Sequence, residues 1–359
     1  MSAIMLPQDQ QDPQQNDNQD AAIVASIVDI GTRRAVFAQM YAQHQSERFV
    51  TTLIAIDTAI RYALSGDSLT GLNRRKLNAA LASVQAALTD IYLGYTDSLQ
   101  ADVLQFAANE AEFTGKTLAQ VTGDSANTPS DDDVQAAVKR NPLSLAGATG
   151  ALLPAYIAKW AASEVDAVVG SIRLGAFTGK NNAEILQAIR GTSALNYKDG
   201  LLSKAGDRAK SVANTAVVHA SSVARQETFA VNPQIATEYR WVSILDSRTC
   251  VVCGSLSERV FLIGKGPLPQ IHNNCRCNVV PILPDDTGAD NRNYYSWLKD
   301  QPAEFIDLAL GPTRGKLLRD GGLSAARFSA LLLDRNFKAL SLEEIKRLDP
   351  IAWVRAGLR

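Results

Sequence analysis

The sequence has no long apolar run. It contains no stretch of about eighteen uncharged apolar residues, which is the length that a membrane-spanning helix needs. Its most hydrophobic window, residues 152–170, is interrupted by Lys159, Glu164 and Asp166. The first ten residues also lack the basic start and apolar centre of a secretion signal. We therefore expect a soluble protein with no membrane anchor, located in a bacterial-type cytosol or in a particle assembled there.

Net charge is nearly absent as well. The 36 basic and 37 acidic residues leave a formal charge of −1 at pH 7. This balance does not support long-range attraction to nucleic acid or to an anionic membrane, although it leaves room for a local basic face. Because 46% of the 359 residues are hydrophobic, the chain can bury a sizeable core, and its length predicts more than one folding unit.

Common catalytic motifs are missing too. No G-x-S-x-G, H-E-x-x-H or G-x-G-x-x-G occurs, and only three histidines are scattered along the chain. Residues 175–181 and 311–317 superficially resemble a phosphate loop, but each has one residue too few between its glycines and no Ser or Thr to hold Mg²⁺. His219 lies on the apolar stripe of a predicted helix, which is typical of a packing histidine. The sequence therefore predicts a protein that is not an enzyme.

The cysteines are few and clustered. All four lie between Trp241 and Pro281, as a C-x2-C pair followed about twenty residues later by H-x2-C-x-C. In a reducing compartment, this clustering favours a metal or free thiols over disulfides. The pattern suits a tetrahedral metal, because each turn directs ligands at one centre. Five candidates compete for four places: Cys250, Cys253, His272, Cys275 and Cys277. Since four of them are sulfur, we predict a closed, structural zinc site, with a metal-free sheet lined by buried cysteines as the alternative.

Charged residues flank these cysteines. Asp246, just before Cys250, is expected to accept backbone N–H bonds in a tight turn. Arg276, between two cysteines, is expected to balance thiolate charge or to contact a partner.

The same stretch resembles the signature of phage Mu protein F-like minor head proteins, also called phage head morphogenesis proteins. The resemblance rests on W-x4-D-x-R-T-C-x2-C and the later H-x2-C-R-C. It extends upstream to about residue 155, and downstream through Trp297-Leu298-Lys299 and residues 310–314.

This resemblance implies a minor head protein of a tailed phage or prophage, acting in head morphogenesis, genome packaging or DNA delivery. It implies a virion component at the capsid interior or the portal vertex, assembled in the host cytoplasm. The implied partners are the portal protein and other capsid or procapsid proteins, with weak contact with packaged DNA. Two alternatives remain open: a metal-dependent enzyme, such as a nuclease or toxin-like effector using His272 or His219, and a zinc-ribbon protein that binds nucleic acid.

Periodicity predicts a mostly α, α+β fold. Apolar residues recur at helical spacing through the first third of the chain, and β-branched and aromatic runs near residues 239–244, 259–263 and 278–282 predict a small antiparallel sheet. The expected organisation runs through five segments: a disordered Gln/Asp-rich arm at 1–20, a long helical hairpin at 21–121, a polar linker at 122–140, a Mu F-like domain at 141–285 with its Cys/His ribbon at 239–283, and a helical tail at 286–359.

Overall fold

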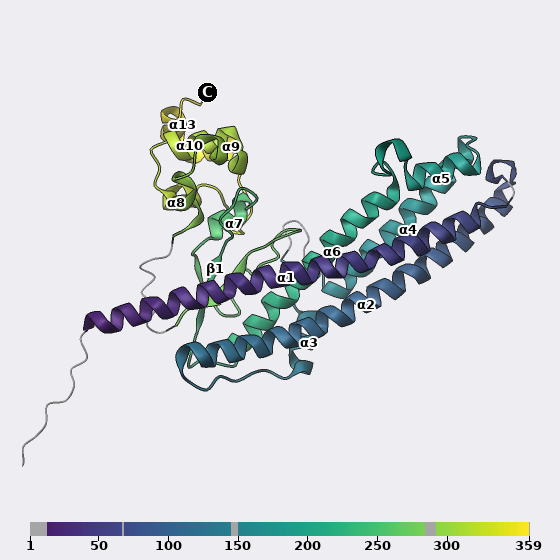
Figure 1. Ribbon diagram of the computed structural model, residues 1–359. Helices are drawn as coiled ribbons and strands as arrows, with labels where there is room; N and C mark the ends of the chain where they lie inside the picture. Colours follow the sequence, from purple (N-terminus) through teal and green to yellow (C-terminus); the bar gives the residue numbers. More distant parts are fainter. Residues whose placement is uncertain (1–12, 67, 145–149, 284–291, 359) are drawn as a thin grey trace, which may run out of the picture.

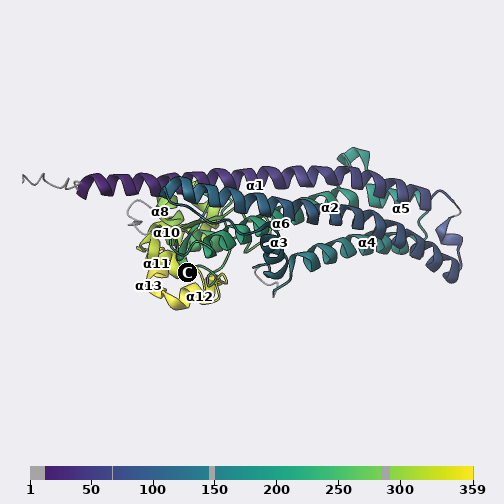
Figure 2. The same cartoon turned by 90° about the horizontal axis from the view of Figure 1, so that it is seen from below.

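The computed structural model describes residues 13–66, 68–144, 150–283 and 292–358, and its architecture is mostly helical with one three-stranded antiparallel sheet. The predicted fold class is therefore confirmed. Figures 1 and 2 show a long helical rod that carries the sheet and a group of short C-terminal helices at one end. None of the described helices is both long enough and apolar enough to cross a membrane.

Two long helices form the predicted N-terminal hairpin: α1 (Pro13–Ala63) and α2 (Arg74–Thr122), joined through the short 3-10 helix η1 (Leu69–Gly71). The side chain of Asn73 caps α2 by accepting from the backbone N–H of Lys76, and Gly123 ends this helix in a left-handed conformation. Helix α1 begins earlier than expected, so residues 13–20 are helical rather than disordered; the rest of the expected arm lies outside the described residues.

Part of the expected linker at 122–140 is also helical. Helix α3 (Asp131–Arg140) is capped by Ser130, whose side chain accepts from the backbone N–H of Asp133. Its run of three aspartates looks like a solvated loop by composition, but these carboxylates lie in the first turn, where the helix dipole favours negative charge. Val134, Ala137 and Val138 are buried. Residues 131–140 of the expected linker thus form a helix that packs against the rest of the protein.

The central helices lie against the hairpin (Figure 1). They are α4 (Leu153–Phe177), α5 (Asn182–Arg190), the 3-10 helix η2 (Ser193–Leu195) and α6 (Leu201–Ala230). Asn181 and Glu184 form a capping box at the start of α5. One continuous apolar core contains residues of α1 to α6, so the hairpin and the central helices are packed as one rod.

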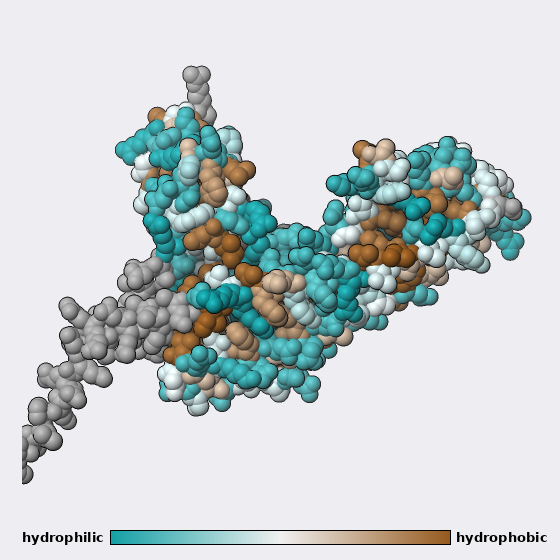
Figure 3. Space-filling view, in the orientation of Figure 1, coloured by the Kyte–Doolittle hydropathy of each residue, from teal (hydrophilic) through white to brown (hydrophobic). Residues whose placement is uncertain are grey.

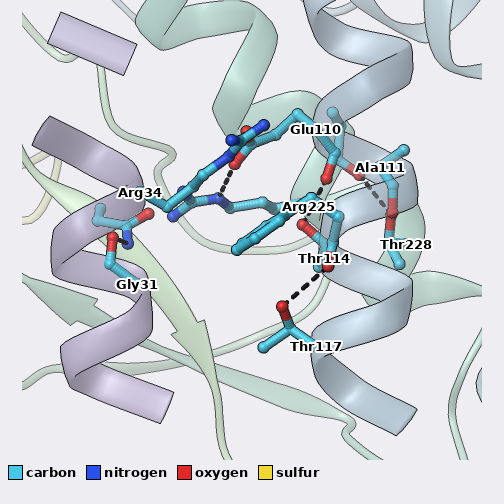
Figure 4. A network of polar contacts seen from close by, with 11 residues as sticks. Gly31, Arg34, Glu110, Ala111, Thr114, Thr117, Arg225 and Thr228 are labelled. Atoms are coloured by element: carbon cyan, nitrogen blue, oxygen red, sulfur yellow. Dashed lines mark hydrogen bonds and ion pairs between the residues drawn. The ribbon is translucent and has the colours of Figure 1, made fainter. Parts of the chain in front are cut away.

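A buried ionic contact ties three of these helices together. Figure 4 shows Arg34 of α1 and Arg225 of α6 directed at Glu110 of α2. Arg34 Nε donates to one carboxylate oxygen at 2.6 Å and Arg225 Nε to the other at 2.7 Å. The Glu110 side chain is fully buried. Each carboxylate oxygen thus has a charged donor of its own.

The sheet has the order β2-β1-β3, built from β1 (Glu238–Val242), β2 (Val260–Leu262) and β3 (Asn278–Pro281). Its pairing is antiparallel, as predicted. Helix α1 crosses close to β3: the carbonyl oxygen of Gly31 accepts a hydrogen bond from Asn278 Nδ2 at 2.7 Å. A Cβ at Gly31 would lie 2.8 Å from that nitrogen and from Val280 Cγ1, so a larger residue here would force these side chains to move.

The C-terminal region forms a core of its own from short helices. These are α8 (Tyr294–Lys299), α9 (Ala303–Leu310), α10 (Pro312–Asp320), α11 (Ala325–Ala330), α12 (Leu342–Leu348) and α13 (Pro350–Arg355). A capping box of Ser341 and Glu344 begins α12.

The four tryptophans are divided among three separate apolar cores. Trp160 lies in the core of the rod, and Trp241 lies in a small core around the cysteines. Trp297 and Trp353 lie in the core of the C-terminal helices.

Candidate metal centre

The first cysteine pair is held by the start of a short helix. Helix α7 (Val251–Leu256) follows β1, and Cys250 is its N-cap residue. The Cys250 sulfur accepts from the backbone N–H of Cys253 at 3.4 Å. The C-x2-C spacing therefore forms the first helical turn, where a cap residue and the third residue after it face each other. Sequence reasoning expected only a turn here.

The second group comes from the loop that leads into β3. His272 Nε2 lies 3.2 Å from the sulfur of Cys253, and the sulfurs of Cys253 and Cys275 lie 3.9 Å apart. The ligand atoms form two overlapping groups, and within each group they all lie within 4.8 Å of one another. The first group is Cys250, Cys253 and His272, and the second is Cys253, Cys275 and Cys277. The structure thus brings together all five predicted candidates, with Cys253 common to both groups.

The ring of His272 is oriented for ligation. Its Nδ1 lies 2.7 Å from the backbone carbonyl oxygen of Asn273. A carbonyl only accepts, so Nδ1 carries a proton, and Nε2 faces the sulfurs, where loss of its proton would free a lone pair for a metal. A ligating histidine commonly donates its other ring N–H in this way, which fixes both the tautomer and the ring orientation.

Cys277 has different surroundings. It is buried, and its sulfur lies 3.8 Å from the hydroxyl of Ser243. That hydroxyl donates to the carbonyl of Cys253 at 2.7 Å and accepts from the indole N–H of Trp241 at 3.1 Å. Cys277 thus contacts both the sulfur cluster and the polar side chain behind it.

The thiols influence one another strongly. The neighbouring Cys253, followed by His272, lowers the pKa of Cys250 to about 5. Hydrogen bonds from Cys253 and Cys277 hold the pKa of Cys275 well below its ordinary value. Burial opposes protonation of His272, but the Cys250 and Cys275 sulfurs outweigh it and raise its pKa to about 11. Cys253, by contrast, has its pKa held well above the ordinary value by its hydrogen bonds with Cys250 and Cys275, and a divalent cation bound in the cluster would allow this thiol to ionise as well.

Asp246 and Arg276 form a pair across the two cysteine loops. The guanidinium donates to both carboxylate oxygens, at 2.6 and 2.7 Å. Asp246 also accepts from the backbone N–H of Arg248 at 3.0 Å, which is the predicted turn contact. Arg276 lowers the pKa of Asp246 to about 2. The sequence predicted that Arg276 balances thiolate charge or contacts a partner. It did not predict the pairing with Asp246, because the two residues are far apart in the chain.

The remaining polar residues of interest serve packing. Tyr294 donates its hydroxyl to the carbonyl of Asp246 at 2.9 Å, and Tyr295 to that of Val251 at 3.0 Å, which ties the C-terminal helices to the cysteine loops. His219 is buried on α6 and its Nε2 lies 3.2 Å from the carbonyl of Val138. It belongs to neither Cys/His group, in keeping with a packing role.

Comparison with known families agrees with the resemblance seen in the sequence. The family model described as Phage Mu protein F like protein matches residues 170–280, which include all of α6, the sheet except the last residue of β3, and all five Cys/His residues. The resemblance is thus confirmed over this region. Neither the search of curated proteins nor the search of solved structures found a match.

Proposed function

We propose that this Mu F-like chain is a minor head protein of a tailed phage or prophage, and that it acts at the portal vertex or capsid interior during head morphogenesis, genome packaging or DNA delivery. The match of residues 170–280 to the family carries the proposal, and it supports a protein related to phage heads. The portal and other procapsid proteins are the proposed partners, with packaged DNA as a weaker contact.

The metal centre fits a structural role in this proposal. We infer that Cys250, Cys253, His272 and Cys275 hold one zinc ion and that Cys277 lies behind them. The 3.9 Å separation of the Cys253 and Cys275 sulfurs matches the roughly 3.8 Å that tetrahedral zinc with bonds of about 2.3 Å requires. Four protein ligands close the site, leaving no position for the water that a catalytic zinc needs.

The rod supplies the proposed contact with the particle. Helix α1 exposes Val36, Met40, Val50 and Ile54. Their spacing puts them on one stripe of the helix. Figure 3 shows apolar residues gathered on the exposed face of the rod. Exposed apolar stripes of this kind are typical of interaction surfaces.

Co-sedimentation with portal-containing procapsids tests the proposal. The full-length protein should sediment with them, and the double variant Val50→Asp/Ile54→Asp should remain in solution while keeping its helical circular dichroism. Leu348→Asp is the matched control, since Leu348 is also exposed and apolar but lies on α12. Binding of wild-type protein to neither procapsids nor portal rings, together with cleavage of DNA that depends on His272, would establish the enzyme alternative instead.

A further inference from the structure

A groove lies directly beside the metal centre. It has a volume of about 520 Å³ and is formed between α1, α6 and the two cysteine loops. This volume lies within the range of ligand sites in proteins. His272 lines it, so the groove and the metal centre share one wall.

The charge of this groove is basic. Lys210, Arg248 and Arg276 line it, and no Asp or Glu is among its lining residues in the described part of the chain. Asp246 is the nearby carboxylate; it pairs with Arg276 at 2.6 Å and lies 3.6 Å from Arg248 Nε. Lys210 has no ion-pair partner among the described residues. A local basic surface therefore exists on a chain whose net charge is close to zero.

The other lining residues are amides and aliphatic side chains. Gln39, Gln43, Asn273 and Asn274 offer both donors and acceptors, as a peptide backbone requires. Val36 and Met40 of α1 form an apolar wall and are 52% and 65% exposed. No Phe, Tyr or Trp is among the described lining residues, and both ring nitrogens of His272 already face Cys253 and Asn273, so bases of a single strand would find no row of aromatic side chains to stack on.

We propose that this groove binds an acidic peptide segment of a partner protein. Carboxylates of the peptide would pair with Lys210 and Arg248, its backbone would bond to the amides, and an aliphatic side chain would contact Val36 and Met40. This proposal names a partner chemistry and does not depend on the head-protein function. A partner segment docked here would also cover His272.

Fluorescence anisotropy of the full chain loaded with zinc tests the proposal. The probe is a fluorescein-labelled peptide, Asp-Leu-Glu-Asp-Leu-Glu, and its amide analogue Asn-Leu-Gln-Asn-Leu-Gln is the ligand control. The acidic peptide should bind more tightly, and Lys210→Glu should weaken its binding by at least about tenfold, since a charge-assisted hydrogen bond is lost and a repulsion is added. Arg248→Gln should weaken it in the same direction.

Lys204→Glu is the matched protein control, because Lys204 is exposed on the same helix but does not line the groove. It should leave binding unchanged. Equal binding of the acidic and amide peptides, or equal effects of the two lysine variants, would overturn the proposal. So would Lys210-dependent binding of a single-stranded oligothymidylate or of inorganic phosphate without binding of the acidic peptide.

Discussion

Arg225 on α6 donates from Nε to the Glu110 carboxylate on α2 at 2.7 Å, and their side chains are 5% and 0% exposed. The second carboxylate oxygen of Glu110 accepts a hydrogen bond from Nε of Arg34 on α1. The Arg34 guanidinium also lies 4.3 Å from the centre of the Phe113 ring. Three long helices thus converge on one buried carboxylate.

Replacing that carboxylate should be costly. Glu110→Gln leaves two guanidiniums without their counter-charge, so the free energy of unfolding should fall by about 3–5 kcal/mol, measured by urea denaturation. Glu112→Gln is the matched control two residues along the same helix, because its pair with Lys116 is on the surface, and it should have little effect. Similar losses of unfolding free energy for both variants would show that the buried network contributes no more stability than the surface pair.

The crossing of α1 over β3 should tolerate only glycine. Gly31→Ala places a methyl group 2.8 Å from both Asn278 Nδ2 and Val280 Cγ1, so the stability should fall by about 1–3 kcal/mol. Gly94→Ala in α2 meets no atom within 4 Å and should raise stability by about 0.5–1 kcal/mol, because alanine restricts the unfolded chain. Thermal melts of the two variants compare them directly. An unchanged melting temperature for Gly31→Ala would contradict the prediction and show that the side chains of Asn278 and Val280 move aside without cost.

The burial of His219 predicts a pH dependence. Desolvation lowers its pKa to about 4 from the ordinary 6.5, so the unfolded chain takes up a proton before the folded one. The stability contributed by the neutral ring is intact above pH 6.5 and should fall by roughly 3 kcal/mol as the pH drops towards 4. Urea denaturation at pH 7 and pH 4 should show this loss in wild type and much less of it in His219→Gln.

The exposed His44 provides the comparison for that experiment. His44→Gln should follow the wild-type pH dependence, because it leaves the buried contact between His219 and the carbonyl of Val138 in place. Loss of acid sensitivity in both variants, or in neither, would contradict the assignment to His219.

The proposed zinc site predicts a graded response among the cysteines. Protein purified without chelator should contain about one zinc per chain by elemental analysis. Cys253→Ser should abolish binding, because Cys253 is common to both ligand groups. Cys277→Ser should keep the metal with an affinity reduced by about 10–100-fold, as expected of a residue that supports the ligands. Equal loss in Cys277→Ser and Cys275→Ser would place Cys277 among the ligands.

Hydrogen exchange should locate the damage caused by Cys253→Ser. Cys253 lies in a small apolar core with Trp241, Cys275 and Cys277, and this core is separate from the core of the rod. Protection should therefore be lost over residues 239–283 and kept in α1, α2 and α4. Uniform loss would show that the rod and the metal centre unfold together.

Much of this fold follows from patterns that are local in sequence. Helical spacing predicts α1 and α2, β-branched runs predict the three strands, and the cap at Asn181 is visible because its partner Glu184 is three residues away. The clustering of the cysteines with His272 is equally visible, since metal ligands recur at short spacings. Helix α3 was missed because its aspartates have a poor helix propensity, which the cap at Ser130 and the burial of Val134 override.

Contacts between segments that are distant in the sequence could not be predicted from local patterns. The pairing of Arg276 with Asp246, the convergence of Arg34 and Arg225 on Glu110, and the basic groove all join residues from separate elements. A single sequence shows the charges but not which of them meet. The glycine at position 31 likewise stands out only when β3 is seen against α1.

Because the tryptophans are divided among three cores, their intrinsic fluorescence can report on each core separately. Trp241 is fully buried next to Cys253 and Ser243, and Trp160 is packed among Phe49, Tyr92 and Tyr95 in the rod. Variants that keep one indole at a time would thus emit from the Cys/His cluster, the rod or the C-terminal helices alone. Release of the metal, separation of the rod helices and melting of the tail could then be followed as three separate fluorescence signals, with no added dye.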